Sequence, residues 1–255
     1  MSESASGDDR LRVAVFRPND DRLAEARALL DELGVDPVSD PMLAVEPTDA
    51  TPRGADYVVF TSKTGAELVA AAGWTPGAAT VVAIGPKTAA ALEAAGYAVD
   101  LLPDDYSSSG LVDLLADRAA GASVEVARSD HGSAVLLDGL REAGADVRET
   151  VLYRLVRPEG AGNSTTLAAE GRLDAACFTS SLTVEHFRDA AAERGVREAA
   201  IAGLNDAVVG VIGEPTRETA ESHGITVDVV PAEATFEALA RETVARLRTV
   251  DDASR

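Results

Sequence analysis

The sequence predicts an α/β protein made of two similar parallel-sheet lobes of the flavodoxin-like kind. Two observations carry this prediction. Short apolar strands alternate with alanine-rich helices along most of the chain, which is the pattern of a parallel sheet covered by helices on both faces. The segments Gly85–Pro103 and Gly213–Pro231 also repeat one pattern: Gly-x-x-Thr, a short helix, Gly, and then Val-Asp, two apolar residues and Pro. Such a duplication in only two copies indicates two similar domains.

The first elements of the chain are a strand and a helix. Leu11–Phe16 is a run rich in valine and other apolar residues, which predicts a buried strand. Asp20–Leu33 repeats leucine and alanine at helical spacing and stops at Gly34, a usual residue beyond a helix C-terminus. The following stretch, 35–54, contains four prolines, which forbid a helix and favour an extended connection.

Beyond residue 56 the chain contains two sets of strand-like runs separated by helical segments. The runs of the first set are 57–62, 80–85, 98–103, 123–128 and 145–156. A polar, glycine-containing loop, Arg157–Thr166, then precedes a second set with similar sequences at 175–180, 208–213 and 226–231. The order of the elements therefore begins again after the loop, as expected for two lobes of the same architecture.

The second set has no nearby strand that matches Leu11–Phe16, so we expect the N-terminal strand and helix to complete the C-terminal lobe. The first lobe would then be discontinuous and the second inserted into it, joined by a two-stranded extended neck. The predicted bounds are 11–37 with 158–249 for the first lobe, 48–150 for the second, 38–47 and 151–157 for the connecting strands, and 1–10 and 250–255 for the tails.

Composition excludes several classes of function. The formal charge of −20 over 255 residues argues against a nucleic-acid surface, which needs clustered Lys and Arg. No apolar run approaches the ~20 residues of a membrane helix, and the polar N-terminal segment has no apolar core of a secretion signal. We therefore expect a soluble, cytoplasmic, monomeric protein. Its acidic surface with only two lysines is typical of adaptation to a salt-filled cytoplasm.

The sequence gives no sign of a metal or a cofactor. Cys177 stands alone in an apolar run, and the three histidines are far apart without ligand spacing. A partial glycine pattern at Gly160 and Gly162 follows a proline loop rather than a strand, so it does not indicate a nucleotide site. We expect neither a metal nor a cofactor.

Candidate binding residues lie where strands of the predicted sheets end. Ligands of open parallel sheets bind beyond the carboxyl ends of the strands, where helix N-termini present unpaired amides that suit carboxylates or phosphates. The turns at these ends are Thr61-Ser62, Gly85–Thr88, Thr179-Ser180 and Gly213–Thr216. Each hydroxyl could instead be only a helix N-cap. Both lysines of the chain, Lys63 and Lys87, fall in these turns and suggest an anionic ligand.

Seven stretches together give the chain a family resemblance. They are VVFTSKTG (58–65), AIGPKTAAALEAAG (83–96), LLPDDYSSSGLVDLL (101–115), VRETVLYRL (147–155), ACFTSSLTVEHF (176–187), VIGEPTRETAESHG (211–224) and VVPAEATFEAL (229–239). In order and spacing they resemble the uroporphyrinogen-III synthase family over Leu11–Leu247. The resemblance implies cofactor-free cyclisation of the linear tetrapyrrole hydroxymethylbilane, with loss of water and inversion of ring D, in a cleft between two lobes.

The resemblance also implies roles for individual residues. Tyr153 matches a family tyrosine beside the cleft; because a phenol has an ordinary pKa near ~10, it would act as a proton donor to the departing hydroxyl. The other residues are expected to contact the substrate: Ser62, Lys63, Gly85, Lys87, Thr88, Arg128, Ser180, Gly213 and Thr216. Three positions depart from the family pattern, namely Lys63, the turn that follows Arg128, and the acidic Glu214.

Two interpretations without catalysis remain open at this stage. A two-lobed protein of this kind could bind an anionic metabolite without changing it, or it could be a regulatory protein that has lost activity. Tyr153 on a connecting strand favours catalysis, and the lack of an appended DNA-binding segment argues against the regulatory interpretation.

Overall fold

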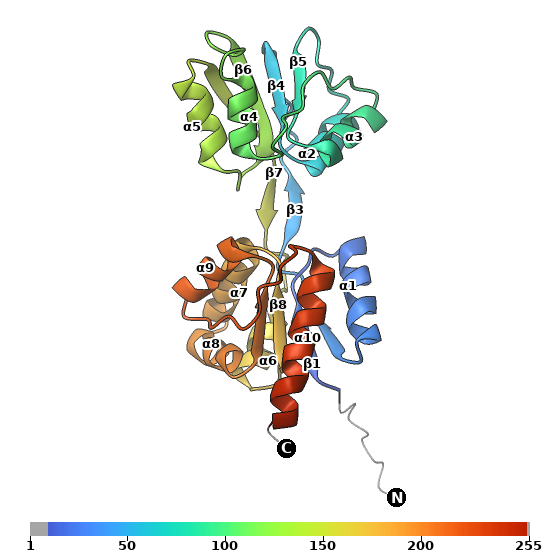
Figure 1. The fold of residues 1–255 in the computed structure, drawn as a ribbon, viewed down its shortest axis with the longest axis vertical. Helices are drawn as coiled ribbons and strands as arrows, with labels where there is room; N and C mark the ends of the chain where they lie inside the picture. Colours follow the sequence, from blue (N-terminus) through green and yellow to red (C-terminus); the bar gives the residue numbers. More distant parts are fainter. Residues whose placement is uncertain (1–9, 254–255) are drawn as a thin grey trace, which may run out of the picture. The chain divides into compact units, whose positions relative to one another are not determined.

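The computed structural model describes residues 10–253, which form two compact units, each built on its own sheet (Figure 1). The first unit contains the described residues up to Ala44 together with those from Val156 onward, and the second is Val45–Leu155. Among the described residues no helix has both the length and the apolar character needed to cross a membrane.

The sheet of the first unit joins strands from both ends of the chain. Its order is β2-β1-β8-β9, and every neighbouring pair is parallel. The bounds are β1 Arg12–Val15, β2 Asp36–Ser39, β8 Ala175–Phe178 and β9 Val208–Val211. The N-terminal segment therefore completes the sheet of the C-terminal half, which confirms the predicted fold class.

Helices cover both faces of this sheet. One face packs against α1 (Asp21–Glu32) and α10 (Phe236–Ala253). The other face packs against α6 (Asn163–Ala169), α7 (Ser181–Glu193), α8 (Arg197–Asn205) and α9 (Glu214–Ser222). Strands β1, β8 and β9 are buried on both sides, which explains why they read as largely apolar runs rather than alternating ones, whereas β2 is half-buried.

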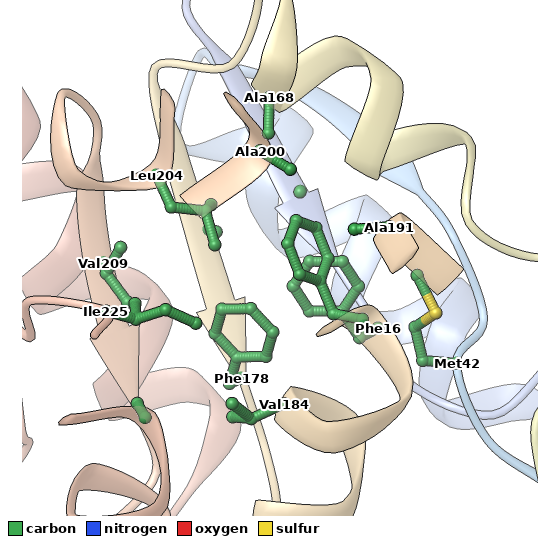
Figure 2. Packing of buried hydrophobic residues seen from close by; sticks show 14 of the residues in the cluster. Phe16, Met42, Ala168, Phe178, Val184, Ala191, Ala200, Leu204, Val209 and Ile225 are labelled. Carbon is green, nitrogen blue, oxygen red and sulfur yellow. The ribbon is translucent and has the colours of Figure 1, made fainter. Parts of the chain in front are cut away.

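Three phenylalanines form the centre of one of these cores. Phe16 stacks on Phe178 with ring centroids 4.4 Å apart, and Phe187 of α7 meets the ring of Phe178 edge-on at 5.8 Å. Figure 2 shows Phe16 and Phe178 surrounded by Leu204, Val209 and other aliphatic side chains. Each fully buried phenylalanine contributes roughly 1.5–3 kcal/mol, and each aromatic pair about 0.5–1.5 kcal/mol more.

The second unit is a five-stranded sheet in the order β3-β7-β6-β4-β5. Its strands are β3 Ala44–Pro47, β4 Tyr57–Phe60, β5 Thr80–Ala83, β6 Ser123–Ser129 and β7 Asp146–Val156. Helices α2 (Lys63–Ala71) and α3 (Pro86–Ala94) pack on one face. Helices α4 (Ser108–Leu115) and α5 (Ala134–Glu142) pack on the other. The carboxyl ends of β4, β5 and β6 lie at one edge, because these strands are parallel.

The runs 98–103 and 226–231 are not strands, which corrects the prediction. Each makes a single bridge, Val82 to Leu101 and Gly210 to Val229. The aspartate of each Val-Asp motif adds a side-chain bond to the few backbone bonds at this bridge, because Asp100 Oδ2 accepts from Val81 N at 2.8 Å and Asp228 Oδ2 accepts from Val209 N at 2.9 Å. The repeated Val-Asp therefore has a structural explanation in both units.

The predicted tails also differ from the structure. Helix α10 continues to Ala253, so the segment from Val250 to Ala253 is helical where the sequence predicted a tail. Polar residues such as the two aspartates of this segment do not by themselves end a helix, and sequence patterns place helix ends only to within a residue or two. Residues 1–9 and 254–255 of the predicted tails lie outside the described part of the chain.

A buried carboxylate joins two segments of the first unit that are far apart in the sequence. Gly162 precedes α6 in the left-handed region, with φ 113°, and offers no capping side chain. Asp40, buried after β2, supplies the cap instead, since its oxygens accept from the amides of Gly162 and Ser164, both at 2.8 Å, and from the Ser164 hydroxyl. A negative charge at a helix N-terminus is stabilising.

We expect Asp40→Asn to lower the free energy of unfolding by about 2 kcal/mol, because it removes the charge and forces an amide group toward amide donors. Urea unfolding followed by circular dichroism measures the change. Asp138→Asn is the control: Asp138 is exposed on α5 and pairs with Arg141, at 3.2 Å. Equal effects of the two substitutions would contradict the capping role of Asp40.

Candidate functional site

A pocket of about 200 Å³ lies at the carboxyl edge of the second unit's sheet. It is rich in hydroxyl groups and is lined by Thr61, Ser62, Ile84, Ser108, Arg128, Ser129, Gly132, Ser133, Leu136 and Tyr153. The structure therefore brings together three of the residues predicted from sequence, Ser62, Arg128 and Tyr153. They come from three different strands or the turns that follow them.

The phenol of Tyr153 faces the first helical turn of α2. Its Oη donates to Ser62 Oγ at 3.0 Å, and the same Oγ accepts from Gly65 N at 3.0 Å as the N-cap of α2. The pairing of β6 with β7 shifts register between Arg128 and Ser129, so that Tyr153 lies opposite Ser129. Tyr153 is 7% exposed and lines this pocket.

Arg128 is committed to partners inside the protein. Its Nε donates to Glu149 Oε1 at 2.6 Å, and its Nη1 donates to the carbonyl of Ser133. The turn admits this side chain because residue 132 is glycine: a Cβ there would lie 2.5 Å from Arg128 Cδ. Arg128 thus holds the turn 129–133 in place, and its charge is already balanced, which disfavours the predicted direct contact with substrate.

The two lysines line one groove, between α2 and α3, with a volume of about 820 Å³. Lys63 Nζ pairs with Glu67 at 3.2 Å, whereas the described residues offer Lys87 no ion pair. Most of the remaining lining is alanine. The groove is therefore lined mainly by alanine, with the two lysines and the carboxylate of Glu67 as its charged groups.

The two glycine turns open their helices without a side-chain cap. Gly85 precedes α3 and Gly213 precedes α9, both with extended backbone and neither with a capping side chain. In contrast, Ser62 and Ser180 cap α2 and α7. Pro86 and Pro215 have no N–H, and the amides of Thr88 and Thr216 donate to the carbonyls of Gly85 and Gly213. The first-turn amides that lack an acceptor among the described residues are therefore those next to these prolines, and such amides suit anions.

Thr88 and Thr216, the threonines of the repeated Gly-x-x-Thr motif, are nearly inaccessible. They are 4% and 3% exposed, so their side chains offer little surface to a ligand. Glu214, the acidic departure in the second of these turns, pairs with Arg217 at 3.5 Å in its own helix. Arg217 therefore reduces the repulsion that this carboxylate would exert on an anion.

In the first unit, the helix starts near Ser180 and Gly213 are linked directly. Ser180 Oγ accepts from Thr183 N at 3.3 Å. Its neighbour Ser181 donates to the carbonyl of Pro215 at 3.0 Å, which ties α7 to the turn that contains Gly213. Ser180, Gly213 and Thr216 thus belong to two adjoining turns of one edge.

The sequence-based prediction missed three hydroxyl residues of the pocket, Ser108, Ser129 and Ser133. Ser129 follows Arg128 directly, and Ser108 lies in the stretch 101–115 that carries the resemblance. Their presence in one pocket depends on the packing of α4 beside the end of β6, which the sequence does not show. Cys177 contributes no nucleophile, because burial raises the pKa of its thiol to about 12. The described residues contain no group of three or more potential metal ligands.

Comparison with known proteins gives consistent results. A family model described as uroporphyrinogen-III synthase HemD matches residues 24–241. A provisionally named uroporphyrinogen-III synthase from Methanothermobacter thermautotrophicus is 34% identical over 231 residues, covering 84% of this chain and 90% of that protein. The fold is similar to a mutant uroporphyrinogen III synthase from the extremely thermophilic bacterium Thermus thermophilus, with a TM-score of 0.66, 22% identity, and coverage of 94% of this chain and 99% of that one. The fold is also similar to uroporphyrinogen-III synthetase from Helicobacter pylori, with a TM-score of 0.59, 15% identity, and coverage of 93% of this chain and 99% of that one.

Proposed function

The chain belongs to the uroporphyrinogen-III synthase family, and from this premise we propose that the hydroxyl-lined pocket of its second unit receives the reacting end of the substrate. The reaction of the family is the cyclisation of hydroxymethylbilane to uroporphyrinogen III with loss of water. Membership of the family favours this enzymatic function over a binding or regulatory protein without catalysis. The observation that carries the choice of pocket is the Tyr153 hydroxyl, which meets Ser62 inside it.

We propose that Tyr153 protonates the hydroxyl group that leaves from ring A. The carbon–oxygen bond breaks, water departs, and the pyrrole nitrogen supplies the electron pair that forms an azafulvene. The proton of the pyrrole N–H is lost in this step and restores the phenol of Tyr153. The substituted carbon of ring D attacks this electrophile to give a spiro intermediate, which opens and recloses with ring D inverted. Ser62 would hold the phenol in position, because its Oγ is itself fixed by the amide of Gly65.

The rest of the substrate is proposed to lie outside this pocket. At about 200 Å³ the pocket is smaller than the roughly 300–1,000 Å³ that usually enclose a drug-sized ligand, so it admits only part of a tetrapyrrole. We propose that the carboxylates of the substrate are bound by amides of the Gly85 and Gly213 turns and by Lys63 and Lys87. Thr88 and Thr216 would then act by shaping these turns rather than by direct contact.

Ser180 is proposed to act in the same way as Ser62, as a cap that fixes a turn beside the substrate. Arg128 is proposed to order the turn 129–133 that lines the pocket. Both assignments keep the predicted residues in the site but give them a supporting role.

The activity is tested by incubating the full chain with hydroxymethylbilane, oxidising the products and separating the type I and type III isomers. We expect type III to dominate with the native protein. The heat-denatured protein should give only type I, since the linear substrate closes to that isomer unaided. Type I alone with the native protein would contradict the enzymatic function.

We also propose that the protein works as a monomer in a cytoplasm rich in salt, without nucleic-acid or membrane partners. The formal charge is −20, and the negative side chains repel one another over a screening length of about 30 Å at 0.01 M salt but only about 3 Å at 1 M. Circular dichroism is therefore expected to show a native spectrum at 1 M salt and loss of fold at 0.01 M. A native spectrum at both concentrations would argue against the adaptation to salt.

A further inference from the structure

Arg17 occupies the position in the first unit that Arg128 occupies in the second. The run 175–180 repeats the run 57–62, so Cys177 corresponds to Val59. Cys177 lies opposite Val15 in the first sheet, and Val59 lies opposite Val126 in the second. Val15 and Val126 are therefore equivalent, and the arginine two residues beyond each of them stands at the same carboxyl edge.

The surroundings of the two arginines agree with this equivalence. Arg128 shares its pocket with Ser108, the first residue of α4. The guanidinium of Arg17 lies over the ring of Phe236, the first residue of α10, with Cζ 4.9 Å from the ring centroid. Ser108 and Phe236 occupy the same position in the duplicated sequence when the prolines at 103 and 231 are aligned. Each unit thus places an arginine beside the same helix start.

The partner that neutralises Arg128 has no counterpart beside Arg17. Glu149, which pairs with Arg128, lies opposite Val126 in the sheet of the second unit. The residue opposite Val15 in the first unit is Ser39, which carries no charge. The exchange of glutamate for serine removes the internal acceptor from this edge of the first unit.

Asp20, the acidic residue that follows Arg17 in the chain, is bound to another arginine. It accepts from Nε of Arg22 at 2.9 Å and from the backbone amide of Arg22 at 3.0 Å, as the cap of α1. Within the described part of the chain, Arg17 makes no hydrogen bond or ion pair, and its guanidinium contacts the Phe236 ring. Burial, and secondly the charge of Arg22, lower the pKa of Arg17, as expected for a cation without a bonded acceptor.

We infer that Arg17 binds a carboxylate of the substrate at the carboxyl edge of the first unit, where Phe236 holds the guanidinium in place. A guanidinium offers a planar fork that matches a carboxylate bidentately, and an aromatic face orients it without using its N–H donors. A chain of charge −20 must attract a polyanion through local cations, and among the described residues Arg17 is a cation that Asp20 and Glu25 influence from a distance without bonding it. This inference rests on the proposed function, because it takes the same polycarboxylate as ligand.

The test compares four purified full-length proteins: the wild type, Arg17→Gln, Arg17→Lys and the control Arg27→Gln. Arg27 is an exposed residue of α1, so its replacement changes the net charge equally without touching this edge. Steady-state formation of type III product gives kcat and KM. Calorimetric titration with uroporphyrin III, the oxidised and unreactive octacarboxylate, gives a dissociation constant that does not depend on turnover.

We expect Arg17→Gln to raise KM for hydroxymethylbilane, and the dissociation constant for uroporphyrin III, by roughly tenfold, the loss of one charge-assisted contact. Its kcat should change less than about twofold, because Arg17 is assigned to binding rather than to the chemical step. Arg17→Lys keeps the charge but not the planar guanidinium, so its KM and dissociation constant should lie between those of the wild type and of Arg17→Gln. It also serves as the test if Arg17→Gln does not fold.

Three outcomes would overturn the inference. In the first, KM and the dissociation constant of Arg17→Gln are within about twofold of those of Arg27→Gln. In the second, Arg17→Gln lowers kcat and leaves KM unchanged. In the third, the wild type does not bind uroporphyrin III. If the wild type forms no type III product but binds uroporphyrin III, and Arg17→Gln weakens that binding tenfold, the proposed reaction fails while the role of Arg17 stands.

Discussion

Replacing Tyr153 by phenylalanine is expected to lower kcat for type III product by about 100-fold, within the range that general acid catalysis usually contributes. The substitution removes the hydroxyl that meets Ser62 in the pocket and keeps the ring that packs in the core. The reaction would then have to expel hydroxide or take its proton from water. Because hydroxymethylbilane also closes unaided, the product mixture should shift toward type I as the enzymatic route slows.

Tyr57→Phe is the matched control for this experiment. Tyr57 belongs to the same unit, and its hydroxyl donates to the carbonyl of Arg118 at 3.2 Å, but it starts β4 at the end opposite Ser62. Thermal unfolding of both variants should stay close to the wild type, since each substitution removes one neutral hydrogen bond worth about 1 kcal/mol. Equal turnover by Tyr153→Phe and Tyr57→Phe would reject the role of Tyr153 as a proton donor.

The sequence was sufficient for the fold because the fold depends on repeated patterns. Alternation of strands and helices, and the two matching glycine motifs, are visible without coordinates, and they led to a sheet that joins the N-terminal strand to the C-terminal half. The runs 98–103 and 226–231 were predicted as strands, but each pairs with its neighbour at a single bridge, through a few backbone bonds and the carboxylate of Asp100 or Asp228. A strand-like sequence pattern does not reveal how short that pairing is.

The site was less predictable, because its chemistry depends on register and on partners. The sequence placed Ser62 at a strand end, and the family resemblance placed Tyr153 on a connecting strand beside the cleft. Their hydrogen bond accompanies a shift in the pairing of β6 and β7 that no residue pattern predicts. Arg128 looked available to an anion, although Glu149 in the next strand neutralises it. Arg17, which lacks such a partner, was missed because the sequence does not show which residue of the neighbouring strand lies beside each arginine. That residue is Ser39 in the first unit and Glu149 in the second.

The helix crossing between α6 and α8 leads to the largest expected loss of stability. Gly203 lies within α8, where a glycine costs roughly 0.5–1 kcal/mol relative to alanine, so its presence needs a reason. A Cβ at this position would lie 1.8 Å from the carbonyl oxygen of Ala168, a buried residue of α6. The two helix backbones therefore touch where residue 203 has no side chain.

Gly203→Ala is expected to destabilise the protein by about 4 kcal/mol, beyond the usual cost of overpacking, because the obstructing atom belongs to a backbone and cannot rotate away. Helix α6 has little freedom to withdraw, since Asp40 holds its first turn. Gly139→Ala in α5 is the comparison: a Cβ there would meet both methyl groups of Val112, at 2.7 and 2.9 Å, which is a clash with a side chain and not with a backbone, and alanine favours the helix by about 1 kcal/mol. Urea unfolding should therefore separate the two variants by several kcal/mol. An unfolded Gly203→Ala protein would agree with the expectation, whereas equal midpoints would show that α6 and α8 are free to move apart.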